Sequence, residues 1–145
     1  MTPYFEHRHV VGLEETNLVG NVYFSHFMRW QGQCREMFLR EHAPEVLTDL
    51  ADGFKIFTVS CTCEYLAEVS AFEEISIRLY LKELTQTQIA FAFGYFRVDG
   101  PAERQVARGT QRVVCMRAAQ GEIVPARVPE SLRSALASYR LGDDG

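Results

Sequence analysis

The sequence predicts an α+β fold in which an antiparallel sheet of five strands curls around one long central helix. An apolar stripe at helical spacing runs through residues 22–41. One shorter run of β-forming residues precedes the stripe, and four long runs follow it between residues 54 and 118. No linker, repeat or low-complexity tract interrupts the chain. We therefore expect one domain over residues 1–145, with a tail from about residue 125.

Composition and charge bound the class of protein. The chain has 145 residues, of which 47% are hydrophobic and 23% charged, as in an ordinary globular domain. The net charge of −4 and the lack of a basic block argue against nucleic acid or an anionic membrane as the main partner. No apolar run approaches the roughly 20 residues of a membrane span, and the first eight residues lack the apolar segment of a signal peptide. We expect a cytoplasmic protein.

The four cysteines fit reduced thiols in a core rather than a metal site. Cys61 and Cys63 are two residues apart, so in a strand they point to the same face. A zinc site would need CxxC-type pairs or histidines at ligand spacing, and the sequence has neither. We predict no metal and no cofactor.

The chain begins with a predicted strand over residues 4–13 and a turn over residues 14–21. His7 and His9 share one face of this strand. We interpret both as exposed polar positions, because no carboxylate or cysteine stands at ligand spacing near them.

The long helix is predicted over Val22–Glu41. Its apolar stripe consists of Phe24, Phe27, Met28, Trp30, Cys34, Met37 and Phe38. The stripe is broad, so we expect the sheet to wrap the helix rather than to touch it along one line. A loop over residues 42–53 follows, with a short helix at Pro44–Leu50, since proline is favoured at the first helical position.

Four strands in hairpin succession are predicted next, at Phe54–Ala67, Glu74–Leu84, Gln88–Val98 and Gln105–Ala118. Turns are expected at Asp99–Gly100 and Gln120–Gly121, a helix at Glu130–Arg140, and a frayed end over Leu141–Gly145. One sheet curled around one helix leaves a free strand edge. We therefore expect a second copy of the chain to cover that edge in a homodimer.

A polar turn, ETNLVGNVYF at residues 15–24, leads directly into the long helix. Gly20 permits a sharp bend, because it has no Cβ to clash. The first backbone N–H groups of a helix have no intrahelical acceptor, so they can bind an oxyanion or a carbonyl oxygen. The sequence thus places its chemistry at this turn.

This turn and the helix after it resemble the hotdog-fold thioesterases of the 4-hydroxybenzoyl-CoA thioesterase type. That family carries Asp-x-x-Gly-x-Val-x-Phe/Tyr, followed by an aromatic-bearing helix with a tryptophan. The matching positions are Asn17, Gly20, Val22, Phe24 and Trp30. The resemblance covers about residues 5–118 and implies the hotdog fold and hydrolysis of a thioester.

Residues 15–39 are most similar, within this family, to the thioesterases of enediyne polyketide pathways. In that subgroup asparagine replaces the family aspartate, as Asn17 does here, and an arginine matched by Arg35 is associated with activity. The implied partner is the acyl carrier protein domain of an iterative polyketide synthase. The implied substrate is a β-keto polyene thioester, whose released β-keto acid can lose CO2 to give a methyl ketone polyene. The resemblance also suggests a dimer of dimers.

Asparagine changes the chemistry expected of the site. The Asn17 amide does not titrate, so it can orient a water or hydrogen-bond the thioester, but it cannot act as base or nucleophile. By family position the oxyanion donors are the backbone N–H of Phe24 and its neighbour Tyr23. Arg35 is always charged and would stabilise an enolate or a carboxylate. It lies about 16 Å along the helix from Phe24, so it serves the site of its own subunit or that of a partner.

The residues expected to contact substrate are Gly20, Phe27, Met28, Thr58, Ser60 and Thr62. Strand alternation puts the last three on one face, where they touch the thioester or face solvent. Asn17 could instead be only a turn residue, and Arg35 only a surface group. A general acyl-CoA thioesterase and a non-catalytic acyl-binding protein are the alternative functions. A serine hydrolase is not supported, because the sequence has no GxSxG motif.

An acidic carrier protein would need a basic surface to bind. The candidates for such a patch are Arg29, Arg35, Arg40, Arg104, Arg108 and Arg112.

Overall fold

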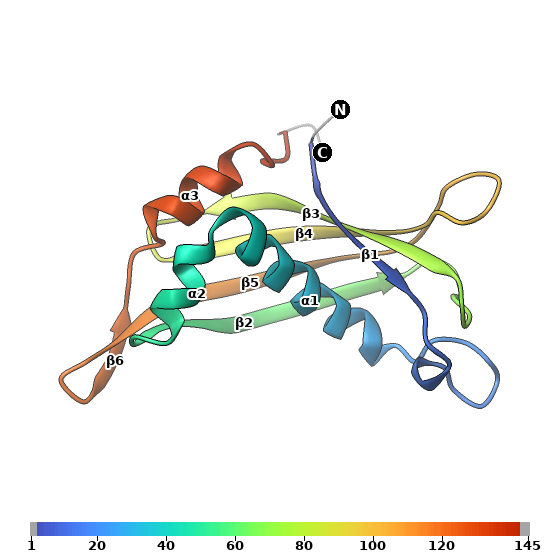
Figure 1. The fold of residues 1–145 in the computed structure, drawn as a ribbon, viewed down its shortest axis with the longest axis horizontal. Coiled ribbons are helices and arrows are strands. Elements are labelled where there is room, and N and C mark those ends of the chain that lie inside the picture. The colour runs from blue at the N-terminus through green and yellow to red at the C-terminus, as the bar shows by residue number, and fades with distance from the viewer. Residues whose placement is uncertain (1–2, 143–145) are drawn as a thin grey trace.

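The computed structural model describes residues 3–142. Its elements are β1 (Phe5–Val10), the 3-10 turn η1 (Leu13–Glu15), α1 (Ser25–His42), α2 (Pro44–Leu50), β2 (Phe54–Tyr65), β3 (Glu74–Leu84), β4 (Gln88–Arg97), β5 (Arg104–Ala119), β6 (Glu122–Pro125) and α3 (Glu130–Ala137). One antiparallel sheet in the order β1-β3-β4-β5-β2 curls around α1, as Figure 1 shows. The predicted α+β architecture is confirmed.

Two features of the sheet differ from the prediction. A sixth strand, β6, pairs with β5 beyond the turn at Gln120–Gly121, where both residues adopt positive φ. In addition, β2 does not form a hairpin with β3. It lies at the far edge of the sheet beside β5, because β1 and β4 occupy both sides of β3. The connection over residues 66–73 must therefore cross the end of the sheet.

That crossing explains why α1 begins at Ser25 rather than at Val22. The backbone N–H of Val22 donates to the Val69 carbonyl oxygen at 2.8 Å, and Asn21 forms a β-bridge with Ser70. A second bridge joins Val22 to Thr16. These pairings hold residues 21 and 22 extended, so the helix can start only after them.

The C-terminal region also departs in part from expectation. Helix α3 ends at Ala137, three residues before the predicted boundary. Leu141 was expected to fray, but its backbone N–H donates to the Leu81 carbonyl oxygen at 2.8 Å. Residues 143–145, the rest of the predicted frayed end, lie outside the described residues.

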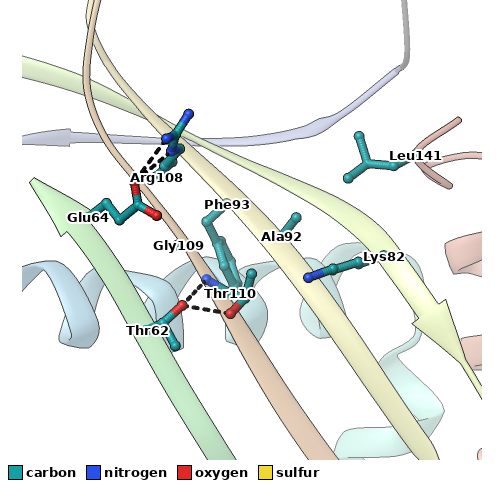
Figure 2. Close-up of a pocket in the computed structure, with 9 residues that line it drawn as sticks. All are labelled: Thr62, Glu64, Lys82, Ala92, Phe93, Arg108, Gly109, Thr110 and Leu141. Atoms are coloured by element: carbon teal, nitrogen blue, oxygen red, sulfur yellow. Dashed lines mark hydrogen bonds and ion pairs between the residues drawn. The ribbon is translucent and has the colours of Figure 1, made fainter. Parts of the chain in front are cut away.

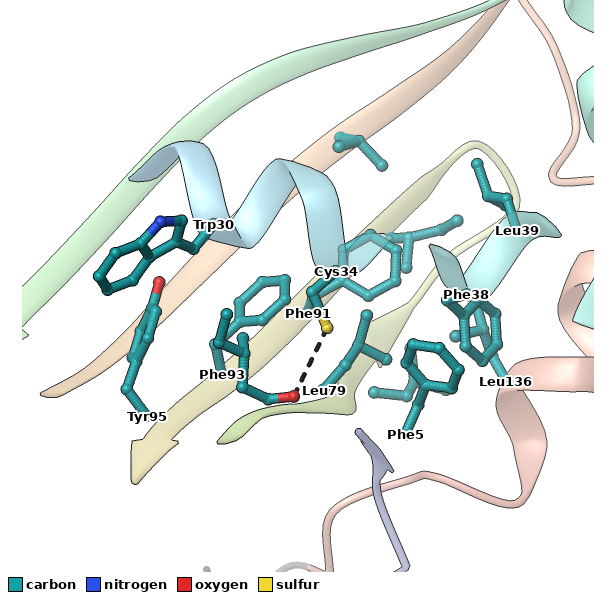
Figure 3. Packing of buried hydrophobic residues seen from close by; sticks show 14 of the residues in the cluster. Phe5, Trp30, Cys34, Phe38, Leu39, Leu79, Phe91, Phe93, Tyr95 and Leu136 are labelled. Carbon is teal, nitrogen blue, oxygen red and sulfur yellow. Dashed lines mark hydrogen bonds between the residues drawn. The ribbon is translucent and has the colours of Figure 1, made fainter. Parts of the chain in front are cut away.

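The core lies between α1 and the inner, concave face of the sheet. Figure 3 shows Trp30, Cys34 and Phe38 of α1 packed against side chains that include Phe91 and Tyr95 of β4. The Tyr95 hydroxyl donates to the Phe27 carbonyl oxygen at 2.8 Å, which pins the first turn of the helix to the sheet. The helix is thus fixed over β3 and β4, and one flank of it faces the edge strand β2.

None of the helices within residues 3–142 has both the length and the apolar character needed to cross a bilayer. All four cysteines are free thiols.

Candidate functional site

A buried carboxylate anchors the start of the predicted catalytic turn. Glu15 accepts hydrogen bonds from the Gly12 N–H at 2.8 Å, from His9 Nε2 at 2.7 Å and from Trp30 Nε1 at 2.8 Å. Burial raises the pKa of Glu15, but these three hydrogen bonds outweigh it and hold the pKa below its ordinary value. Glu15 therefore ties β1 and α1 together immediately before residues 16–24, which we call the site loop.

The interpretation of His9 as an exposed polar position is wrong. Its ring packs at a tilt against Trp30, with centroids 5.0 Å apart, and meets the Glu15 carboxylate on the core side of β1. The partner was missed because η1 folds Glu15 back toward the strand, so the two residues meet without standing at a metal-ligand spacing. His7, which shares this face, is half-buried, and burial lowers its pKa.

The end of the site loop leaves one backbone donor free. The Tyr23 N–H donates to the Glu15 carbonyl oxygen at 3.1 Å, so it is not available as an oxyanion donor, which corrects the expectation for Tyr23. Among the hydrogen bonds within residues 3–142, none uses the N–H of Phe24. The Tyr65 hydroxyl donates to the Phe24 carbonyl oxygen at 3.0 Å and fixes this residue against the end of β2.

Asn17 is both a turn residue and an exposed amide. Its Oδ1 accepts the N–H groups of Val19 at 3.0 Å and Asn21 at 3.2 Å. The Gly20 N–H donates to the Asn17 carbonyl oxygen, and Gly20 adopts φ +89°, which glycine adopts without strain. The side-chain oxygen of Asn17 thus shapes the loop, while its NH2 group has no acceptor within the described residues and faces solvent.

A strip of side chains, all partly exposed except Gln31, connects the site loop with Arg35 along the flank of α1. The helix and β2 run in opposite directions, so successive turns of α1 meet successively earlier residues of β2. The contacts are Phe24 with Tyr65, Met28 and Gln31 with Cys61, and Arg35 with Thr58. We call this the α1–β2 strip. Of the two helix residues expected to contact substrate, Met28 lies on this strip, whereas Phe27 is only 3% exposed and forms part of the core behind it.

Arg35 is held at the far end of the strip by neutral groups. Its Nη1 donates to Gln111 Oε1 at 2.8 Å and to Thr58 Oγ1 at 3.4 Å. None of the ion pairs within residues 3–142 involves Arg35. Burial lowers the pKa of this guanidinium. Arg35 is thus a partly desolvated cation without an anionic partner, and the structure gives no contact between it and Asn17.

The predicted common face of Thr58, Ser60 and Thr62 does not exist. The pairing of β2 with β5 shifts between Thr58, which pairs with Val113, and Ser60, which pairs with Arg112. This bulge at Val59 reverses the alternation of the strand. Thr58 therefore points to α1, whereas Ser60 and Thr62 lie on the outer face of the sheet.

The outer face carries a shallow pocket of its own. The volume of this pocket is about 290 Å³. Figure 2 shows Thr62, Thr110, Lys82 and Ala92 around it, on the side of the sheet away from α1. The Thr62 and Thr110 hydroxyl oxygens are 2.6 Å apart. Because the sheet separates this pocket from the α1–β2 strip, neither Thr62 nor Ser60 is placed to contact a thioester at the site loop.

The six arginines considered as a basic patch do not gather on one surface. Arg108 pairs with Glu64 at 2.9 Å and Arg112 with Glu83 at 2.7 Å, both on the outer face. Arg35 lies on the inner side of the same sheet. The six arginines therefore do not form one basic patch to which a carrier protein could bind.

Two buried glutamines were not predicted from the sequence, although each left a signal. Gln111 is 4% exposed on β5, at the inward position two residues before the core residue Val113. Gln31 is fully buried, and its Nε2 donates to the Thr62 carbonyl oxygen at 2.9 Å. A polar residue in an otherwise apolar inward series is the pattern that marks such positions.

Gly109 makes room for Gln31. A Cβ at position 109 would clash with the Gln31 amide and with the Thr62 carbonyl oxygen, which is backbone and cannot move aside. We expect Gly109→Ala to destabilise the protein by about 1–3 kcal/mol, the usual range for overpacking. Thermal unfolding would measure this loss. Gly32→Ala is the matched control: a Cβ there meets nothing within 4 Å, and in a helix interior alanine is about 1 kcal/mol more favourable than glycine.

Within residues 3–142, no group of three His, Cys, Asp or Glu side chains is arranged to hold a metal ion. Of the predicted catalytic groups, the Phe24 N–H, the Asn17 NH2 group and part of the Arg35 guanidinium have no acceptor within the described residues.

Comparison with known proteins assigns the family. The model of the thioesterase-like superfamily matches residues 11–136. The chain belongs to this superfamily. Dynemicin thioesterase, whose crystal structures reveal effects of polyene binding, is 47% identical in sequence to this thioesterase. The match covers 97% of this chain and 99% of that chain, with a TM-score of 0.94. No curated protein matches the sequence significantly.

More distant structures share the fold. The 1,4-dihydroxy-2-naphthoyl-CoA thioesterase from Synechocystis is 16% identical over 92% of this chain and 96% of that chain, with a TM-score of 0.79. A variant of 4-hydroxybenzoyl-CoA thioesterase complexed with 4-hydroxybenzoyl-CoA is 16% identical over 92% of this chain and 99% of that chain, with a TM-score of 0.81. The predictions of a hotdog fold, of a thioester hydrolase and of similarity to enediyne thioesterases are confirmed.

Proposed function

We propose that this thioesterase hydrolyses a β-ketoacyl polyene thioester carried by the acyl carrier protein of an iterative enediyne polyketide synthase. The released β-keto acid can lose CO2 to give a methyl ketone polyene. The observation that carries the proposal is the 47% identity, over nearly the whole chain, with dynemicin thioesterase, a polyene-binding protein. We place a single thioesterase domain over residues 1–145. The four free cysteines fit a protein that acts in the reducing cytoplasm.

The proposed reaction uses three groups and no titrating base. Water attacks the thioester carbon while the carbonyl oxygen accepts the Phe24 N–H, which stabilises the oxyanion. The C–S bond then breaks, and the proton given up by the water leaves with the carrier thiol. The exposed NH2 group of Asn17 orients the water or the thioester. The acyl chain lies along the α1–β2 strip, and Arg35 stabilises an enolate or carboxylate oxygen. Met28, which lies between Phe24 and Arg35 on the strip, supplies apolar contact to the acyl chain.

A homodimer is part of this proposal. β2 is the edge strand of the sheet, and on its outer side it pairs with no strand of the described chain. Phe57 and Val59 on β2 are 44% and 57% exposed, and exposed apolar side chains on an edge strand favour pairing with another chain. A second copy paired along β2 would cover both residues and the α1–β2 strip. Two such dimers would form the tetramer.

The decisive experiment incubates the protein with its cognate synthase and analyses the released products by mass spectrometry. We expect a polyene β-keto acid or its methyl ketone. Absence of any released polyene would contradict the proposal. The same acyl group should then be offered on the carrier protein and on CoA, because a higher kcat/KM for the CoA thioester would favour a general acyl-CoA thioesterase.

Asn17→Asp tests the role of the side-chain amide. A carboxylate oxygen can still accept the N–H groups of Val19 and Asn21, so the loop should keep its shape. The NH2 donors are lost, and we expect about a tenfold lower kcat, the equivalent of one neutral hydrogen bond.

An unchanged rate in Asn17→Asp would mean that position 17 only shapes the loop. Asn17→Ala is the comparison variant. It removes the donors and both loop hydrogen bonds together, so it should also lower stability by about 1–2 kcal/mol. Thermal unfolding separates these two effects.

A further inference from the structure

We infer that Gln111 is a positioning residue: its neutral amide oxygen aims Arg35 along the α1–β2 strip without neutralising the guanidinium charge. This inference rests on the proposed function, because it explains how the cation remains available to an anionic oxygen of a β-ketoacyl substrate or of its carboxylate product. It assigns a role to a residue outside the predicted catalytic set.

The geometry identifies Gln111 as the main support of Arg35. The Nη1–Oε1 distance of 2.8 Å is that of a good hydrogen bond, whereas the 3.4 Å contact with Thr58 is weak. Gln111 is 4% exposed and belongs to a strand on which Val113 and Cys115 follow it into the core. Its amide oxygen is therefore held rigidly, and the bond fixes the head of a side chain that otherwise has many rotamers.

Arg35 keeps donors that the protein does not use. A guanidinium has five N–H donors, and only Nη1 has an acceptor within residues 3–142. Every fully buried side-chain nitrogen or oxygen of these residues has a hydrogen-bond partner. The unused nitrogens of Arg35 are therefore not fully buried, and a planar guanidinium with free donors can bind an enolate or a carboxylate with two parallel bonds.

Gln111 is a neutral acceptor, and this neutrality leaves the charge of Arg35 available to a ligand. A partly buried arginine is usually paired with a carboxylate, because the isolated charge is costly to desolvate. Here Gln111 occupies the place that a glutamate would fill with the same size and reach. A glutamate would satisfy Arg35 better, but it would also compete directly with an anionic ligand. The amide keeps the orientation and leaves the charge for the ligand.

Gln111→Glu tests this inference with the 3-oxodecanoyl and decanoyl thioesters of N-acetylcysteamine. We expect kcat/KM for the 3-oxo substrate to fall about 100-fold, as for loss of one charged stabilising group. For decanoyl, which has no β-oxygen, we expect less than a threefold change. A purely structural role predicts the opposite result, because glutamate preserves the hydrogen bond to Arg35. Gln105→Glu, which adds the same charge to an exposed position of β5, is the matched control and should match the wild type.

Three results separate the possibilities. Wild-type kcat/KM in Gln111→Glu, or an equal loss for both thioesters, would overturn the inference. If Gln111→Glu does not fold, Gln111→Met replaces it: the acceptor is removed, so a loss of about tenfold confined to the 3-oxo substrate supports the inference, and an equal loss for both refutes it. Full activity in Arg35→Met would instead refute the proposed site itself, independently of Gln111.

Discussion

Replacing Arg35 with methionine is expected to lower kcat/KM for a β-ketoacyl thioester by about 100- to 1,000-fold. The guanidinium is the one cation on the α1–β2 strip within the described residues, and its contacts are neutral. No other side chain of the strip can offer a positive charge to an enolate or a carboxylate. The loss should therefore be one of transition-state stabilisation, visible in kcat as well as in kcat/KM.

The same substitution should change the melting temperature little, because the gain from removing a desolvated charge is offset by the loss of the donor to the buried Gln111 oxygen. Arg35 is partly desolvated and has no ion-pair partner, so its charge costs free energy in the folded state. Methionine keeps most of the apolar stem that packs between α1 and β2. A large loss of activity without loss of stability is the behaviour of a residue retained for function rather than for folding.

Arg35→Lys and Arg35→Ala complete this series. Lysine keeps the charge but not the planar donor group, so its activity should lie between that of the wild type and that of methionine. Alanine should be as inactive as methionine and somewhat less stable. A strongly destabilised Arg35→Met variant with full specific activity would show that Arg35 is a structural residue.

Regular periodicity made much of the fold predictable from the sequence. The bounds of α2 and β3 were predicted to the residue, and α1 ends one residue from its predicted end. The α1 and β3 segments show strong helical or alternating apolar patterns, and α2 begins at a proline, so none of these predictions needs knowledge of neighbouring segments. The resemblance at the site loop likewise rested on residues close together in sequence.

The missed features depend on contacts between distant segments. The bulge at Val59 follows from how β2 pairs with β5, so alternation alone placed Ser60 and Thr62 on the wrong face. The start of α1 depends on the Val69 carbonyl oxygen, which lies 47 residues beyond Val22 in the sequence. Neither partner can be found by reading one segment at a time.

Glu15→Ala is expected to cause the largest loss of stability among the substitutions considered, about 3 kcal/mol or roughly 10 °C in melting temperature. The Glu15 side chain is 7% exposed and accepts three hydrogen bonds. Its removal leaves the buried indole N–H of Trp30 without an acceptor. Activity should fall as well. The Glu15 carbonyl oxygen accepts the Tyr23 N–H, so the end of the site loop is held less firmly once the residue 15 side chain no longer fixes its own backbone.

Glu15→Gln separates charge from shape. The amide oxygen can still accept two of the three donors, but its NH2 group faces a third donor and repels it. We expect an intermediate loss of about 1–2 kcal/mol, measured by thermal unfolding at neutral pH. Glu14→Gln, an exposed neighbour in the same 3-10 turn, should leave the melting temperature unchanged.

The pH dependence of stability gives an independent test of the same carboxylate. The folded-state pKa of Glu15 is below its ordinary value of 4.5, because the hydrogen bonds from Gly12, His9 and Trp30 outweigh the effect of burial. The unfolded chain therefore binds this proton more tightly, so the stabilisation is fully present above about pH 5 and disappears as the pH falls through the folded-state pKa. The melting temperature of the wild type should fall below pH 4.5 by more than that of Glu15→Gln, which lacks this proton-binding site. Parallel curves for the two proteins would show that Glu15 contributes through shape alone.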